Sequence, residues 1–165
     1  ALQPRIVNAG VVETEAGKPA IVWPSIAHGL NFAVRLTTIR TYILLARCSD
    51  ISLNAAPFLL GDSTDYAYHA GTSTWLDGGN AYPNVRNGDN RLNGATVNFT
   101  TTNRNTLRYI FTMVHAGAAP ASQLTQDRGG TGRSWIGPIQ EVIIYTTDQT
   151  ANRAAIEANI TTHYF

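Results

Sequence analysis

The stretch that decides the fold is the strand-like run Trp135-Ile136-Gly137-Pro138-Ile139-Gln140-Glu141-Val142-Ile143-Ile144-Tyr145, which is followed by a helix-like run from 150 to about 163. In the second run the apolar stripe consists of Ala155, Ile156, Asn159 and Ile160, at the spacing of one helix face. A short helix with one narrow stripe is marginal in water, so we expect it to pack against sheets.

Two further features of this helix are predicted. Arg153 and Glu157 lie four residues apart and are expected to pair on its exposed side. Thr147 or Thr150 is expected to supply the N-cap hydroxyl.

Short β-type runs fill the rest of the chain and are separated by Gly, Asn, Asp and Pro, a spacing typical of a sandwich or barrel. The run 109–114 is apolar at nearly every position, which predicts a central strand covered on both faces. Segments 71–93 and 116–134 lack periodicity and are expected to be loops. The expected strands are 5–7, 20–23, 31–36, 41–48, 57–60, 66–70, 95–100, 107–115 and 141–147.

Length and composition restrict the possible functions. The 165 residues fit one domain, 1–165, and the charged fraction of 14% is well below the roughly 25% of a typical soluble domain, as in many β-proteins that work outside cells. A net charge of +1 argues against a nucleic-acid or anionic-membrane partner. Apolar runs are far shorter than the ~18 residues of a membrane span. The chain lacks an initiator Met and a signal peptide, so we expect a piece of a longer protein.

The basic residues and the cysteine favour structural roles. The eleven arginines are scattered singly, which is typical of surface solvation or of pairing with a nearby carboxylate. Cys48 is the only cysteine and ends an apolar run, so we expect a buried thiol and no disulfide.

Segment 66–91 carries the most suggestive surface chemistry, because it combines aromatic rings with amides, carboxylates and arginines. Flat aromatic faces suit the apolar side of a sugar ring, and the polar groups suit its hydroxyls. A second interpretation is that Tyr66 and Tyr68 fill the core and Trp75 caps it. The predicted ligand-binding residues are Trp75, Tyr82, Asn84, Arg86, Asn87, Asp89 and Arg91.

A calcium site is the one cofactor that the sequence leaves open. Asp62, Asp65 and Asp77 stand in oxygen-rich loops of the kind that bind Ca²⁺, although no EF-hand pattern is present. The alternative is that these side chains form turns by accepting hydrogen bonds from their own backbone.

No catalytic constellation is recognised. Glu141 has no second carboxylate two residues on, and Asp62 and Asp65 are placed in a loop, so a glycoside hydrolase is the least favoured interpretation. The four histidines are dispersed, and no G-x-S-x-G elbow occurs. We therefore expect a protein that is not an enzyme.

The C-terminal stretch also carries a family likeness. A Gly-x-Ile-x-Glu strand at 137–141 is followed by an Arg-x-x-Ile-Glu helix at 153–157 and by the closing aromatic Tyr164. These residues resemble the C-terminal signature of concanavalin A-like, laminin-G-type jelly rolls. The run 92–94, Leu-Asn-Gly, resembles the Asn-Gly hairpin of that family, and 17–20, Gly-Lys-Pro-Ala, resembles its opening.

The resemblance implies an all-β fold, an antiparallel sandwich of jelly-roll type with one short C-terminal helix. Domains of this kind occur in phage tail fibres, virions and bacterial surface proteins, where they bind carbohydrates or receptors. We therefore expect an extracellular or virion-surface adhesion module that binds a glycan or cell-surface receptor and works as a homo-oligomer or within a larger assembly. The alternative is a structural domain that decorates a capsid or tail and contacts protein.

Overall fold

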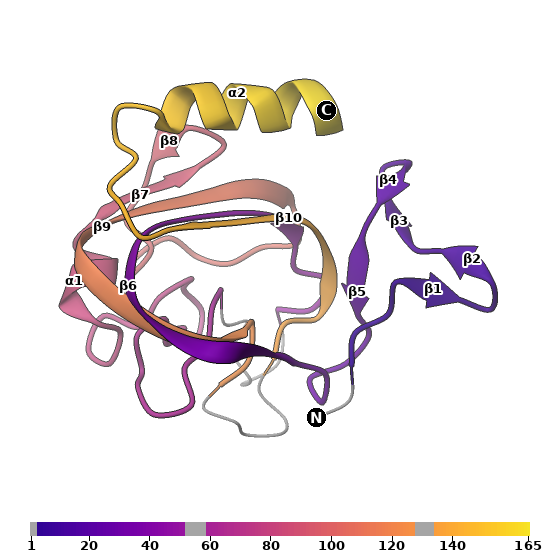
Figure 1. Ribbon diagram of the computed structural model, residues 1–165, viewed down its shortest axis with the longest axis horizontal. Coiled ribbons are helices and arrows are strands. Elements are labelled where there is room, and N and C mark those ends of the chain that lie inside the picture. Colours follow the sequence, from indigo (N-terminus) through magenta and orange to yellow (C-terminus); the bar gives the residue numbers. More distant parts are fainter. Residues whose placement is uncertain (1–2, 52–58, 128–133) are drawn as a thin grey trace.

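The computed structural model describes residues 3–51, 59–127 and 134–165. Its main feature is a six-stranded antiparallel sheet in the order β5-β10-β6-β9-β7-β8 (Figure 1). The strands of this sheet are β5 (Ile21–Trp23), β6 (Leu30–Arg47), β7 (Asp89–Leu92), β8 (Ala95–Thr96), β9 (Arg108–Leu124) and β10 (Gly137–Tyr145). The prediction of a mostly antiparallel β-protein is confirmed.

Smaller elements flank this sheet. Two hairpins precede it, formed by β1 (Val7–Asn8) with β2 (Val11–Val12) and by β3 (Thr14–Glu15) with β4 (Lys18–Pro19). The helices are the single turn α1 (Pro83–Arg86) and the C-terminal α2 (Arg153–Tyr164), which confirms the predicted closing helix. None of the helices found in the described ranges is long and apolar enough to cross a membrane.

The centre of the sheet is the pairing of β6 with β9, its two longest strands. Their central parts, 41–46 of β6 and 110–115 of β9, are covered on both faces, as predicted for 109–114, whereas 33–35 of β6 are exposed. Tyr42, Leu44 and Phe111 face the main core, whereas Ile43 and Ile110 face the smaller core beneath α2. The strand period of two thus sends alternate apolar residues into two different cores.

A large bulge in β9 bends this central pair. Thr41 pairs with Val114, and the next pair recorded is Ile39 with Ala119, so β6 advances two residues while β9 advances five. His115 lies where the β6–β9 hydrogen-bond ladder is interrupted, and its Nδ1 donates to the Ile39 carbonyl at 3.1 Å. Such a bulge bends a strand and strengthens its twist. Figure 1 shows both strands curving around the core at this level.

The bulge explains two errors in the predicted strands. The runs 31–36 and 41–48 were expected as separate strands, but both belong to β6, whose pairing is irregular between 31 and 41. The expected loop 116–134 instead begins as the second half of β9, up to 124. Residues 116–121 are Ala, Gly and Pro, a run of small residues that lacks the apolar signal of a strand.

The inner face of the sheet is covered mainly by irregular chain and not by the predicted strands. Residues 66–70 are irregular with a turn at 67–68, and only 95–96 of the run 95–100 is strand. Leu59 and Leu60 lie in a bend. The remainder of the expected strand 57–60 lies outside the described residues. Figure 1 shows this irregular layer on the concave side of β6 and β9, with α2 on the convex side.

The main core contains all three tryptophans. Trp23, Trp75 and Trp135 have no exposed surface, and Trp75 stacks on Trp135 with ring centroids 6.4 Å apart. Cys48 is buried and unbridged as predicted, and burial raises the pKa of its thiol to about 11. The thiol is therefore protonated at neutral pH.

The predicted Asn-Gly hairpin is present between β7 and β8. Asn93 and Gly94 have φ angles of 49° and 80°, as a two-residue type I′ turn requires. The turn before Lys18, at Ala16 and Gly17, has the same pair of positive φ angles, at 49° and 77°.

The helix α2 packs on the outer sheet face through Ile156, Ile160 and Tyr164. The predicted stripe is partly wrong, because Ala155 and Asn159 are exposed. The N-cap position is Asn152, not Thr147 or Thr150, and no side chain caps the helix. These differences arise because the helix begins at Arg153 and its inward face includes the charged pair Arg153 and Glu157.

The predicted contact of Arg153 with Glu157 is confirmed at 2.9 Å, but it is mostly buried, with side-chain exposures of 15% and 10%. It lies against the β7–β8 hairpin, since Arg153 Nε is 3.7 Å from the Asp89 carboxylate, which Arg91 also binds at 2.9 Å. The helix is thus held by both apolar and ionic contacts.

The outer core is small, so Ile160→Ala is expected to lower the free energy of unfolding by about 3 kcal/mol, through lost transfer energy and an incompletely filled cavity. Urea unfolding measures this effect. Asn159→Ala, on the exposed face of the same helix turn, should stay within about 0.5 kcal/mol of the parent. Equal losses in the two variants would contradict the docking described above.

The buried His115 makes the free energy of unfolding depend on pH. Burial lowers the pKa of His115 from 6.5 to about 4, against the raising effect of the Ile39 carbonyl. As the pH falls, His115 therefore binds a proton in the unfolded chain before it does so in the folded one. The free energy of unfolding falls between about pH 6.5 and about pH 4, by about 3 kcal/mol in total. Urea unfolding across this window should show a smaller pH dependence in His115→Gln, whereas His163→Gln, on exposed α2 surface, should keep that of the parent.

Candidate functional site

The structure separates the predicted ligand-binding residues into three places. Trp75 is in the core, where Phe111 meets its ring edge at a centroid distance of 4.7 Å. A ring with no exposed surface offers no face to a sugar. The core role considered for Trp75 is therefore the observed one, and its predicted role in ligand stacking is wrong.

A second group supports the sheet. Asn84 donates from Nδ2 to the Ala118 carbonyl at 2.9 Å, which ties α1 to the bulged part of β9. Asn87 is exposed at the end of α1, where its backbone N–H donates to Pro83. Asp89 and Arg91 belong to the ionic contact with α2 described above. Of these four, Asn87 has the most exposed side chain.

The remaining residues lie on one stretch of the irregular layer, which we call the rim surface. Backbone hydrogen bonds bring its parts together. The His69 carbonyl accepts from the Asp77 N–H at 2.7 Å, and the Ala67 carbonyl accepts from the Tyr82 N–H at 3.2 Å. The rim surface consists of Asp65, Tyr66, His69, Asp77, Tyr82 and Arg86. Four of these were predicted from the sequence: Tyr82 and Arg86 to bind a ligand, and Asp65 and Asp77 to bind a metal.

Tyr66 supplies the exposed aromatic part of the rim surface. It is 37% exposed, and its ring is tilted against that of His69 at a centroid distance of 5.0 Å. Such a contact limits the orientations of the phenol ring while leaving part of it in solvent. Tyr66 and His69 were in the suggestive segment but not among the predicted ligands; the Tyr-x-x-His spacing within a turn is the signal that could have found them.

Polar groups of fixed direction surround this aromatic pair. Asp77 accepts from the N–H groups of Asn80 and Gly79, and the Asn80 contact in particular holds the pKa of Asp77 below its usual range despite partial burial. Arg86 donates to the Gly78 carbonyl from the neighbouring helix turn. Burial, and then the nearby Asp65 charge, raise the pKa of Tyr82, so its hydroxyl stays protonated. The rim surface thus presents both hydrogen-bond donors and acceptors.

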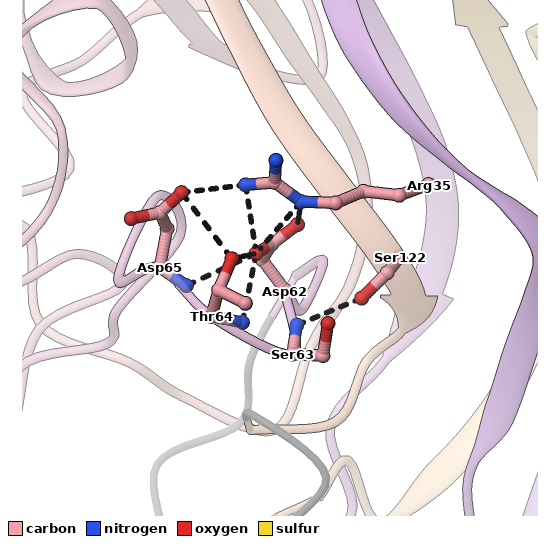
Figure 2. A network of polar contacts seen from close by, with 6 residues as sticks. All are labelled: Arg35, Asp62, Ser63, Thr64, Asp65 and Ser122. Atoms are coloured by element: carbon pink, nitrogen blue, oxygen red, sulfur yellow. Dashed lines mark hydrogen bonds and ion pairs between the residues drawn. The ribbon is translucent and has the colours of Figure 1, made fainter.

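Asp65 belongs to an ionic network that anchors this layer to the sheet (Figure 2). Arg35 of β6 donates to the Asp62 carboxylate through Nε at 2.9 Å, and to Asp65 through Nη2 at 2.5 Å. Asp62 also accepts from the N–H groups of Thr64 and Asp65, both at 3.0 Å. Ser63 N–H donates to the Ser122 hydroxyl of β9 at 2.7 Å.

The network bears on the calcium prediction. The Asp62 side chain has no exposed surface, and although burial raises its pKa, the hydrogen bonds from Arg35 and from the 64–65 turn outweigh this and lower it. An arginine therefore occupies the place beside Asp62 and Asp65 that a cation would need, and Asp77 turns toward its own loop. In the parts of the chain that the structure describes, no three His, Cys, Asp or Glu side chains are grouped to hold a metal.

One acidic spacing was overlooked in the sequence. Glu13 and Glu15 are two residues apart and line one cavity of about 320 Å³ beside Trp23. Arg5 binds Glu13 at 2.9 Å, and Arg47 binds Glu15 at 2.6 Å. A substrate would have to displace an ion pair to reach either carboxylate, so the arrangement supports the β3–β4 hairpin better than hydrolysis.

Comparison of the chain with protein-family models, with curated proteins and with solved structures found no significant match.

The anchoring role of Asp62 is testable. Asp62→Asn keeps the shape but removes the charge that Arg35 binds, so we expect a loss of about 2 kcal/mol in the free energy of unfolding. Asp148→Asn, which alters an exposed aspartate paired with Arg40, should cost less than about 1 kcal/mol. Urea unfolding at neutral pH measures both variants, and an unchanged D62N would contradict the anchoring role.

Proposed function

We propose that the chain is a binding module without chemistry of its own, which recognises a glycan or a glycan-bearing receptor through the rim surface. The observation that carries the proposal is the exposed Tyr66 ring, held on His69 and bordered by fixed polar groups. A sugar ring needs an aromatic face for its C–H side and directed donors and acceptors for its hydroxyls.

The supporting geometry is rigid where recognition requires rigidity. Asp77 is fixed by two backbone N–H groups, Arg86 by a backbone carbonyl, and the layer itself by the Arg35 network. Groups that are already ordered lose little entropy on binding. Each site would remain weak, so display in several copies on a virion or cell surface would raise the avidity.

The proposal includes the finer fold assignment and the setting. The resemblance to concanavalin A-like jelly rolls is supported by the six-stranded antiparallel sheet, the Asn-Gly turn and the helix that follows β10. An extracellular or virion-surface location follows from the same resemblance and from the low charged fraction.

The second candidate function is assembly with other protein chains, and the β1–β2 hairpin favours it. Of the nine large hydrophobic residues exposed in the described chain, four lie in or next to this hairpin. They are Ile6 at 59%, Val7 at 51%, Val11 at 69% and Val12 at 49%. A two-stranded ribbon is marginal alone in water, so a partner chain would stabilise it.

A panel of neutral and acidic oligosaccharides tests the first function, followed by calorimetry with the strongest binder. Tyr66→Ala should weaken binding by at least about tenfold, because it removes the stacking face. Tyr82→Phe should weaken it less, since only a hydroxyl is lost. Tyr145→Ala, on the half-buried outer part of β10, is the matched control and should bind normally. No binding across the panel, together with a stable oligomer in light scattering, would favour assembly instead.

A further inference from the structure

A buried arginine stands apart from every ion pair described above. Arg104 follows the turn at 98–102, and its backbone N–H donates to the Ser73 carbonyl at 2.8 Å. Its side chain extends into the irregular layer, and the residue is only 6% exposed. The one hydrogen bond of the guanidinium runs from Nη2 to the Thr72 carbonyl. Nε and Nη1 are buried, and neither has an acceptor among the described residues.

Among the residues that the structure describes, no carboxylate pairs with this charge. The ion pairs among residues 3–51, 59–127 and 134–165 involve other arginines. The electrostatic neighbour of Arg104 is the Cys48 thiol, whose pKa of about 11 keeps it uncharged at neutral pH. The thiol itself lies 3.2 Å from the Asp50 carbonyl, to which it donates. Within the described chain, Arg104 is therefore a buried positive charge that no carboxylate pairs with.

Such an arrangement is uncommon because it is costly. Buried guanidinium groups are normally paired, since an unpaired charge loses its hydration without compensation. More than nine-tenths of buried polar groups in native proteins have a hydrogen-bond partner. The same layer also holds the Trp75 and Trp135 indole N–H groups without acceptors. Among the described residues, Arg104 is thus a buried cationic donor for which no negatively charged acceptor is present.

We propose that Arg104 is the binding group for a small oxyanion, either a carboxylate or a phosphate, which enters the irregular layer and accepts from Nε or Nη1. Arginine suits this role because its planar donors match the oxygen atoms of both anions. The acidic group of a sugar and a free inorganic or organic anion share this chemistry. The inference does not rest on the rim surface, which lacks Arg104.

The test follows the Arg104 Nε–H signal by NMR in the full ¹⁵N-labelled chain, at constant ionic strength. The probes are sodium acetate, sodium phosphate and sodium glucuronate, with glucose as the neutral control. We expect the Arg104 signal to shift and saturate with at least one anion and to ignore glucose. If glucuronate binds most tightly, the oxyanion that Arg104 binds belongs to an acidic sugar. If acetate or phosphate binds equally well, Arg104 binds a free anion.

Variants and a stability measurement complete the test. The same anions should raise the melting temperature of the parent and of Arg5→Gln, which alters a partly buried ion pair on another arginine. Arg104→Gln should lose this rise and bind at least about tenfold more weakly. If Arg104→Gln does not fold, the Arg104 Nε–H signal of the parent still tests the proposal. That signal is assigned by through-bond correlation to the Arg104 backbone and does not need the variant. An Arg104 signal that no anion moves would overturn the proposal and leave the outcome of Tyr66→Ala unaffected.

Discussion

The pairing of β6 with β9 is the contact on which the other elements depend. It joins residues far apart in the chain and supplies apolar side chains to both cores. The bulge opposite Ile39 bends the pair, and the bend makes the inner face concave enough for irregular chain to cover it. His115 satisfies the Ile39 carbonyl that the interrupted ladder leaves. Burial lowers the pKa of His115 and so favours the neutral ring there, and the nearby charge of Arg40 acts in the same direction.

Arginine is the main means by which this weakly charged protein attaches its loops and its helix. Arg35 holds the 62–65 turn, Arg47 holds the β3–β4 hairpin, and Arg153 joins α2 to β7. Each guanidinium binds more than one oxygen or more than one residue, which suits a planar group with several donors. These attachments occupy most of the carboxylates that the sequence offered to a ligand or a metal. Arg104 differs because the described chain provides no carboxylate for it.

The surfaces that remain after folding define what the protein can recognise. Burial removes Trp75, and Asp89 is bound both by Arg153 of α2 and by Arg91. What is left is a compact aromatic and polar surface around Tyr66 and, on the N-terminal hairpin, an apolar ribbon. The first suits a sugar and the second suits a protein. On the function proposed above, the first surface would bind the glycan and the second a neighbouring chain.

The sequence by itself determined the elements with strong local signals. Period and turn chemistry were sufficient for the 109–114 strand, the Asn93-Gly94 turn, the burial of Cys48 and the C-terminal helix, because each depends on nearby residues. Only the tertiary structure decided which face of each element is covered. Trp75, Asp89 and Arg91 look available to a ligand when only the sequence is considered. In the fold, Trp75 is buried in the core, and Asp89 and Arg91 are bound in ion pairs. The long-range register of β6 on β9, with its bulge, places those partners, and no local pattern encodes it.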